Sequence, residues 1–299
     1  MAPAAYRTPE ERFAGLADWP YEPRYVDLDG LRMHYVDEGS GDPVLLLHGE
    51  PTWSYLYRKT IPPLRRQARV VAPDYFGFGR SDKPLDRDWY TYNRQYHSLE
   101  RFVEALELEE LTLVVHDWGG PIGLRLAVEH PKRVARIVVT NTGVDAGRPP
   151  SETWLRFREV VRDAAGALQP GRIVASGCAQ ALSENAVRAY DAPFPTPESK
   201  TGVLMFPELV PTEPEHPSAA PMLKVRDALT QWQKPALVVF GDSDPIFSPR
   251  AAERMAELIP GAGPAETLPG ASHFLQEDAG EKLGERIATW LTAGSLAAS

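Results

Sequence analysis

The sequence contains very little cysteine and no long hydrophobic run. Its 299 residues include a single cysteine, Cys178, which excludes an internal disulfide and a zinc site built from cysteines. The apolar stretches, such as Val44–Leu47, have the length of strands and are far shorter than the roughly 20 residues that cross a membrane. The first residues show no apolar stretch typical of a secretory signal, and charged residues begin at Arg7. We therefore expect a cytoplasmic protein with no membrane partner.

Basic residues are also scarce relative to acidic ones. The chain has 32 lysines and arginines against 41 aspartates and glutamates, which gives a formal net charge of −9. Proteins that bind nucleic-acid backbones or anionic membranes do so through basic patches. This charge balance makes the chain a poor candidate for either role, so we expect no nucleic-acid partner.

Short apolar runs alternate with helical patterns along most of the chain. Two early segments, Arg24–Asp27 and Met33–Asp37, alternate apolar and polar residues, as half-buried antiparallel strands do. The later runs are almost continuously apolar, which is typical of strands buried on both faces of a parallel sheet. These later runs are Val44–Leu47, Val70–Ala72, Leu113–Val115, Val134–Thr140 and Leu237–Phe240. Together with the helical stretches between them, they predict an α/β fold with a mostly parallel, doubly wound sheet.

The alternation of strand and helix stops in the middle of the chain. Residues 147–221 hold 11 of the 29 prolines and helical patterns such as Trp154–Ala164 and Glu184–Tyr190, but no run typical of a buried strand. A structureless loop of this length would be unusual in a compact domain. We therefore expect a helical cap over residues 147–221, inserted into one α/β core formed by residues 1–146 and 222–299. The cap would lie over the carboxyl ends of the strands, where open α/β folds bind ligands.

The strongest local feature is the run LVVHDWGG at Leu113–Gly120. A buried strand leads directly into a tight turn with glycines, and a helix follows, which is the context of a nucleophile elbow. The usual elbow carries serine in the motif G-x-S-x-G, which this chain lacks; here Asp117 occupies the nucleophile position and Val115 the first glycine position. Asp117 could instead simply cap the helix, so the elbow alone makes it a candidate nucleophile only.

Two downstream segments favour a catalytic role for Asp117. In α/β-hydrolases the nucleophile is followed along the chain by an acid and then by a histidine. A turn after the strand that ends at Phe240 contains Asp242 and Asp244, and a loop after a shorter strand contains His273, the only histidine after that turn. Either acid could orient the histidine. We assign Asp244 to that role and Asp242 to the turn, which predicts a triad of Asp117, Asp244 and His273.

The loop after the first parallel strand reads HGEPTW from His48 to Trp53. In hydrolase folds an oxyanion hole is built from this loop. The backbone N–H groups of Glu50 and Trp118 are the natural pair of donors, while the role of the Glu50 side chain stays open. His116 adjoins the nucleophile, but neighbouring side chains on an elbow diverge, so we assign His116 a structural role.

An aspartate nucleophile favours displacement at a saturated carbon. A carboxylate is already ionised at pH 7, so it can displace a leaving group and form an ester with Asp117. His273, oriented by Asp244, would then deprotonate a water molecule that attacks the carbonyl of this ester. This two-step logic fits two substrate classes, alkyl halides and epoxides.

The two substrate classes need different donors for the leaving atom. A departing halide needs N–H donors in an apolar pocket, for which the tryptophan indole is suited, whereas an epoxide oxygen needs an acidic O–H such as tyrosine. Trp118 adjoins the nucleophile, Trp154 is the only tryptophan of the expected cap, and Tyr190 is its only tyrosine. This distribution favours a halide over the alternative of an epoxide. An intact triad also argues against a hydrolase fold that only binds a small ligand.

Several sequence blocks together resemble the haloalkane dehalogenases, specifically the subfamily with two tryptophan halide donors. These blocks are RTP at 7–9, HGEPTWSYLYRK at 48–59, DYFGFGRSDKP at 74–84, DWGG at 117–120 and YDAPFP at 190–195. The resemblance implies an α/β-hydrolase fold with Asp117 as nucleophile, His273 as base and Asp244 as acid. It also implies that Trp118 binds the halide, and we expect Trp154 to be the second donor because it is the only tryptophan of the cap.

The same resemblance implies the reaction and its partners. A small apolar haloalkane and water would give a primary alcohol, a halide ion and a proton, through an alkyl ester of Asp117. The chemistry requires no cofactor and no metal. We further expect the protein to be a monomer.

Overall fold

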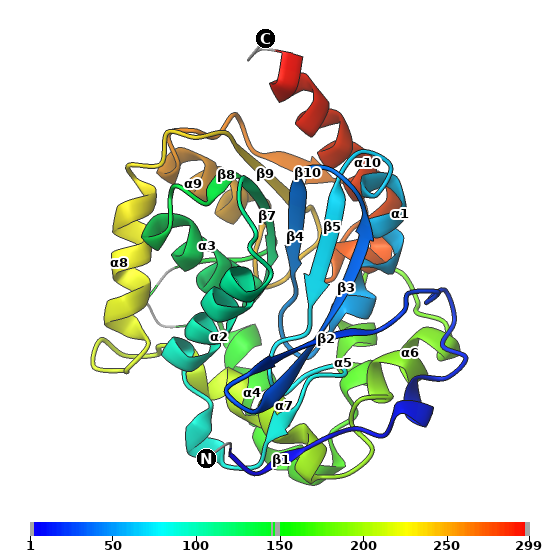
Figure 1. The fold of residues 1–299 in the computed structure, drawn as a ribbon. Coiled ribbons are helices and arrows are strands. Elements are labelled where there is room, and N and C mark those ends of the chain that lie inside the picture. Colours follow the sequence, from blue (N-terminus) through cyan, green and yellow to red (C-terminus); the bar gives the residue numbers. More distant parts are fainter. Residues whose placement is uncertain (1–2, 145, 147–149, 297–299) are drawn as a thin grey trace.

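The structure is a computed structural model that describes residues 3–144, 146 and 150–296 (Figure 1). Its centre is an eight-stranded sheet with the strand order β10-β9-β8-β7-β4-β5-β3-β2. The pairs from β10 to β5 are parallel, whereas β3 pairs antiparallel with both β5 and β2. The strands are β2 (Arg24–Leu28), β3 (Leu31–Gly39), β4 (Pro43–Leu47), β5 (Arg69–Pro73), β7 (Leu111–His116), β8 (Val134–Thr140), β9 (Ala236–Gly241) and β10 (Glu266–Leu268).

Helices cover both faces of this sheet. In Figure 1, α2, α3 and α8 gather on one side of the sheet, while α1 and α10 pack together on the other. The helices are α1 (Ile61–Leu64), α2 (Tyr92–Ala105), α3 (Gly119–Glu129), α4 (Glu152–Ala164), α5 (Pro170–Ser176), α6 (Glu184–Asp191), α7 (Thr201–Met205), α8 (Ala219–Leu229), α9 (Pro249–Leu258) and α10 (Leu275–Leu296). The predicted mostly parallel, doubly wound α/β architecture is therefore confirmed.

The burial of the strands explains the two kinds of apolar pattern in the sequence. Every residue of the central strands β7 and β9 is buried, because helices cover both of their faces. The antiparallel strands β2 and β3 lie at one edge of the sheet and mix buried with partly exposed residues. Asp29 and Gly30, both with positive φ, make the tight turn between them.

The segment between β8 and β9 consists of helices joined by loops, with no strand among its described residues. Its helices α4, α5, α6 and α7 gather at one end of the sheet in Figure 1. Hydrogen bonds join this segment to the rest of the molecule: the Trp53 indole N–H donates to the carbonyl of Ala189, and the Thr8 hydroxyl donates to that of Pro193. The expected start of the cap, residues 147–149, lies outside the described residues, so the cap boundaries stay a prediction.

Two short elements complete the fold. The strands β1 (Ala5–Tyr6) and β6 (Lys83–Pro84) pair antiparallel with one another, and the Arg7 guanidinium beside β1 makes two hydrogen bonds of 2.7 Å with the carboxylate of Asp82. In the part of the chain that the structure describes, no helix is long and apolar enough to cross a membrane.

Candidate active site

Asp117 lies at the turn between β7 and α3, with a backbone φ of +48°. This conformation is unusual for a residue other than glycine and is typical of strained turns at functional sites. The Asp117 carbonyl accepts hydrogen bonds from the Thr142 hydroxyl at 2.6 Å and from the Gly120 N–H at 2.9 Å. A Cβ on Gly119 would lie 2.2 Å from the carbonyl oxygen of Leu47, which shows how closely the turn approaches its neighbours. The glycines after Asp117 therefore permit the elbow.

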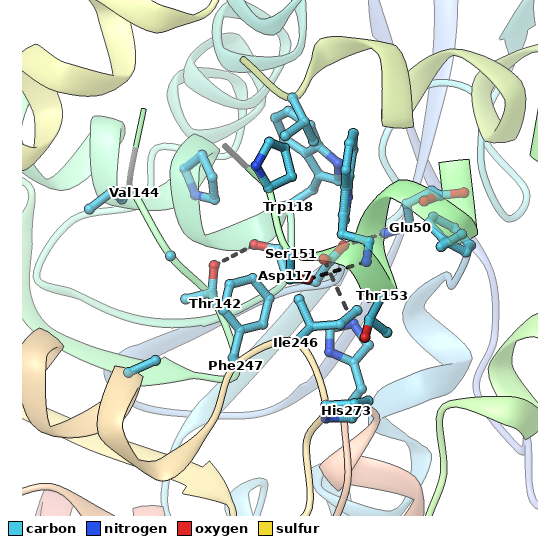
Figure 2. Close-up of a pocket in the computed structure, with 18 of the residues that line it drawn as sticks. Glu50, Asp117, Trp118, Thr142, Val144, Ser151, Thr153, Ile246, Phe247 and His273 are labelled. Carbon is cyan, nitrogen blue, oxygen red and sulfur yellow. Dashed lines mark hydrogen bonds and ion pairs between the residues drawn. The ribbon is translucent and has the colours of Figure 1, made fainter. Parts of the chain in front are cut away.

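The three residues predicted to form a triad lie together. His273 Nδ1 lies 3.0 Å from Asp244 Oδ2. His273 Nε2 lies 3.8 Å from Asp117 Oδ2, and Figure 2 labels these last two residues. The Asp244 side chain is fully buried, and its Oδ1 accepts a 2.7 Å hydrogen bond from the Ile246 N–H. Asp242 instead accepts hydrogen bonds from its own turn and from the N–H of Gly270. Of the two acids in this turn, it is Asp244 that orients the histidine.

Burial and mutual charge set the protonation of these groups. Burial alone would lower the pKa of His273, but the charge and the hydrogen bond of Asp244 outweigh it and raise that pKa. Burial likewise favours protonation of Asp244, yet His273 holds the pKa of this carboxyl well below its usual range. The pKa of Asp117 is raised by burial and lowered in part by His273 and by nearby backbone N–H groups. Asp244 is therefore an anion that fixes Nδ1, and Nε2 lies toward Asp117.

Backbone donors surround the Asp117 carboxylate. The Glu50 N–H donates to Asp117 Oδ1 at 2.8 Å, and the N–H of Trp118 also hydrogen-bonds the carboxyl and lowers its pKa. A Cβ on Gly49 would lie 2.1 Å from Asp117 Oδ1, so the glycine allows the loop after β4 to approach this closely. The two predicted oxyanion donors thus point at the carboxyl that would carry the ester.

The Glu50 side chain is also unusual. It is buried, and its Oε1 has no hydrogen-bond partner among the described residues. Burial, followed by the charge of Asp117, raises the pKa of Glu50 well above its usual range. Burial and the charge of Asp117 therefore favour the neutral form of the Glu50 carboxyl beside Asp117.

A cavity of about 900 Å³ opens above Asp117. Figure 2 shows Asp117, Trp118, Phe247 and His273 around it. Apolar side chains line most of the space, among them Phe157 from α4 and Met222 from α8. A mostly apolar cavity that contains the Asp117 carboxylate suits a small apolar substrate.

Known proteins with similar sequences and structures identify the family. The sequence model of the α/β-hydrolase fold family matches residues 42–280. The haloalkane dehalogenase of Mycobacterium marinum is 44% identical over 95% of this chain and 98% of its own length, and haloalkane dehalogenase 1 of Mycobacterium tuberculosis is 45% identical over 96% and 98%. The solved structure of the haloalkane dehalogenase DpaA from Paraglaciecola agarilytica NO2 superposes with a TM-score of 0.90, at 37% identity, over 95% of this chain and 97% of that one.

The chain belongs to the haloalkane dehalogenase family. Identity above 40% across nearly the whole length places it there, and the expected α/β-hydrolase fold is confirmed. The members of this family are hydrolases that act on carbon–halide bonds.

Both tryptophans expected to bind the halide line the cavity of this dehalogenase. Trp118 is 5% exposed and packs edge-to-face on Phe206 with ring centroids 5.5 Å apart. Trp154, on α4, is partly exposed, and the Arg158 guanidinium lies 5.0 Å above its ring. Among the described residues, neither indole N–H donates a hydrogen bond to another residue.

The tyrosine that an epoxide hydrolase would need lies elsewhere. The Tyr190 hydroxyl donates a hydrogen bond to the buried carboxylate of Glu277. No tyrosine is found among the described residues that line the cavity. The alternative of an epoxide hydrolase is therefore not favoured.

Two further residues contact the triad without approaching the cavity directly. His116 donates from Nε2 to the carbonyl of His273 at 2.8 Å, and burial, with His273 second, lowers its pKa to about 3; its ring is a neutral support. Asn141, which the sequence did not single out, donates from Nδ2 to Asp244 Oδ2 at 2.7 Å and accepts at Oδ1 from the Gly241 N–H at 2.8 Å. The sequence offered one signal for Asn141, its position directly after the strand that ends at Thr140. The loops that carry the triad residues also follow strands at this edge of the sheet.

Proposed function

We propose that the protein hydrolyses haloalkanes to primary alcohols and halide ions in two chemical steps on Asp117. The observation that carries this proposal is how the Glu50 N–H and His273 are placed around the Asp117 carboxyl. Asp117 accepts a hydrogen bond from the Glu50 N–H, while His273 Nε2 stays 3.8 Å away, beyond hydrogen-bond distance. The histidine therefore leaves the nucleophile available for attack and still lies next to the carboxyl where an ester would form.

The first step is alkylation of Asp117. A carboxylate oxygen attacks the carbon that bears the halogen, a carbon–oxygen bond forms, and the carbon–halogen bond breaks with its electron pair leaving on the halide. The indole N–H groups of Trp118 and Trp154 would donate to the departing halide inside the apolar cavity. We assign these two residues as the halide donors, which is the arrangement of the two-tryptophan subfamily.

The second step is hydrolysis of the ester. His273 Nε2 takes a proton from water, and the resulting hydroxide attacks the carbonyl carbon of the Asp117 side chain. The negative charge that develops on the former carbonyl oxygen is stabilised by hydrogen bonds from the N–H groups of Glu50 and Trp118. Collapse breaks the acyl–oxygen bond, and the departing alkoxide takes the proton of the acid formed on Asp117, which releases the alcohol and restores the carboxylate. His273 then gives its proton to solvent, which accounts for the net proton of the reaction. Asp244 stabilises the imidazolium that forms meanwhile.

Halide release tests the proposed activity directly. We expect the wild-type protein to release bromide from 1-bromobutane and 1,2-dibromoethane, and Asp117→Asn to release none because an amide is not a competent nucleophile. His273→Phe should be alkylated once and then accumulate an adduct on Asp117 that mass spectrometry detects. Absence of bromide release from the wild type, together with diol formation from styrene oxide, would contradict the proposal.

A bromide-binding assay can assign the halide donors. Loss of one hydrogen bond to an ion costs about 1.5 to 3 kcal/mol, so Trp118→Phe and Trp154→Phe should each weaken bromide binding roughly 10-fold or more. Bromide quenching of tryptophan fluorescence measures this affinity. Trp232→Phe is the matched control, because Trp232 is buried and does not line the cavity. Unchanged quenching in Trp154→Phe would remove it from the halide site.

The quaternary structure and location also remain proposals. We propose a cytoplasmic monomer whose helical cap spans residues 147–221 and whose core spans residues 1–146 and 222–299. The similar enzyme DpaA has been described as a tetramer. Light scattering of the purified protein distinguishes the two assemblies.

A further inference from the structure

The loop that carries His273 lies directly against the segment between α5 and α6. The Phe274 N–H donates a 3.3 Å hydrogen bond to the carbonyl of Gly177. A Cβ added to Gly177 would lie only 2.6 Å from the Phe274 ring, so the ring and this segment are in close contact. The proposed mechanism makes no use of this contact, although it involves the residue next to the catalytic base.

Asp278 joins the same two segments with its side chain. Its Oδ2 accepts hydrogen bonds from the backbone N–H of Ser272 and from that of Ala179, each at 2.9 Å. Its Oδ1 accepts from the backbone N–H of Gln180 at 2.8 Å. Ser272 immediately precedes His273, whereas Ala179 and Gln180 belong to the segment between α5 and α6. One carboxylate therefore binds three backbone donors from two distant parts of the chain.

Helix capping alone does not account for this arrangement. Asp278 lies in the first turn of α10, where an acidic residue stabilises the helix dipole in any case. None of its three donors belongs to α10, however, and two of them come from residues 179–180. A carboxylate accepting three N–H bonds is a strong and directional attachment, because charge-assisted hydrogen bonds are stronger than neutral ones.

We infer that Asp278 is a positioning residue for His273, which holds the loop of the catalytic base against residues 177–180. The inference rests on the proposed function, since it assigns His273 to ester hydrolysis. Alkylation of Asp117 requires no histidine, so a displaced His273 loop slows only the second step. A misplacement of about 1 Å can cost roughly 100-fold in rate. Through Asp278, the position of residues 177–180 therefore affects how well His273 is placed to act as the base.

Asp278→Asn tests this role in the full-length protein. The amide keeps the size of the side chain but replaces one acceptor oxygen with an NH2 group that cannot accept. With 1-bromobutane we expect ester hydrolysis in single turnovers to slow roughly 10- to 100-fold, while bromide release in the same turnover changes by less than about twofold. Quenched samples should show the alkyl adduct on Asp117 as the main form. Equal slowing of both steps, or no adduct, would overturn the inference.

Matched variants separate this effect from loss of charge or of stability. Glu281→Gln removes the same charge from an exposed position on the same helix and should behave as wild type. In Gly177→Ala the added Cβ would lie 2.6 Å from the Phe274 ring, so residues 177–180 and this ring must move apart, and the adduct should again accumulate. Gly263→Ala is its control, because a Cβ at Gly263 meets no atom within 4 Å. Wild-type behaviour of Gly177→Ala would contradict the link between the segment and the base.

Hydrogen–deuterium exchange of the substrate-free protein gives a readout that does not depend on activity. In Asp278→Asn, backbone amides in residues 177–180 and in residues 270–274 should exchange faster together, and in Glu281→Gln they should not. If the wild type fails to release halide, the proposed function fails while the exchange experiment still decides whether Asp278 couples the two segments. Unchanged exchange in either segment would overturn the inference even if the dehalogenase activity is present.

Discussion

In the proposed reaction, Asp117 as nucleophile and His273 as base each serve one of the two steps. The nucleophile is held by backbone donors and by a positive φ that fixes its direction, and the base is held by Asp244. Because His273 Nε2 is 3.8 Å from Asp117 Oδ2, neither group depends on a direct hydrogen bond to the other. The two steps can therefore be perturbed separately, which is what makes each residue assignment testable.

The raised pKa of His273 predicts where turnover is lost at low pH. The imidazole accepts a proton only when neutral, so ester hydrolysis falls as pH drops through this pKa, which lies above the usual value of about 6.5. Alkylation needs only an ionised Asp117 and should persist to lower pH. Pre-steady-state rates of the two steps measured between pH 5 and 9 check this expectation. Loss of both steps at one common pH would contradict it.

The grouping of side chains was predictable from the sequence where the partners follow a fixed order along the chain. Asp117, Asp244 and His273 each follow a strand, in the order that hydrolase folds use, and this order was visible in the sequence. Asn141 and Asp278 were not predicted, because their partners are mostly backbone groups from distant segments. No spacing or motif marks a side chain whose role is to accept from such groups.

At the scale of elements, the first turn of α10 connects the core with α6. The carboxylate of Glu277 in this turn accepts hydrogen bonds from the guanidinium of Arg58, which precedes α1, and from the hydroxyl of Tyr190 in α6. Arg58, Tyr190 and Glu277 are all buried. The Arg58 guanidinium also lies 4.1 Å from the centroid of the Tyr55 ring. This buried cluster attaches α6 to the core through charge as well as through apolar packing.

Glu277→Gln should strongly destabilise the protein, because it leaves the Arg58 cation buried without its counter-charge. We expect a loss of about 3 kcal/mol in the free energy of unfolding at pH 7, measured with urea. Burial opposes ionisation of Glu277, but Arg58 lowers its pKa below the usual value. Its stabilising contribution is therefore present above that usual value and is lost as pH falls, so the difference between the two proteins should shrink in acid.

A double variant is the control for this prediction. Arg58→Met combined with Glu277→Leu removes both charges and should recover most of the lost stability. If the double variant is as unstable as Glu277→Gln, packing rather than the unpaired cation is the cause.

Helices and strands were predictable where burial leaves a recognisable pattern of apolar residues in the sequence. The continuous apolar runs correctly predicted β4, β5, β7, β8 and β9, since both faces of these strands are buried. The helical patterns at residues 154–164 and 184–190 correctly indicated α4 and α6. The short helices α5 and α7 were not singled out, because five to seven residues are too few to show a helical period.

At the scale of the whole molecule, the cavity lies between the core and the helices over the strand ends. Its lining comes from both parts: Asp117 and His273 from the core, and Phe157 from α4. The sequence could not give its volume, because that depends on how side chains from distant elements pack. The volume of about 900 Å³ is near the upper end of small-molecule pockets.

This cavity predicts a preference for longer substrates. Each methylene buried against the apolar lining contributes about 0.8 kcal/mol, so kcat/KM should rise about fourfold per carbon from 1-bromopropane to 1-bromohexane. Initial rates of bromide release across the series measure this. A maximum at 1-bromopropane would contradict this preference.

The order of the strands has a consequence for how activity arises during folding. The Glu50 loop and the elbow follow neighbouring strands near the middle of the sheet, whereas the loop with His273 follows β10 at its edge. β10 joins the sheet through β9, and β9 pairs in parallel with β8 across the long segment between Thr140 and Ala236. Pairing between strands so distant in sequence is slow to form. When only the central strands of a refolding chain have paired, Asp117 is in place but His273 is not. Catalytic turnover should therefore report completion of the sheet edge, later than circular dichroism reports helices.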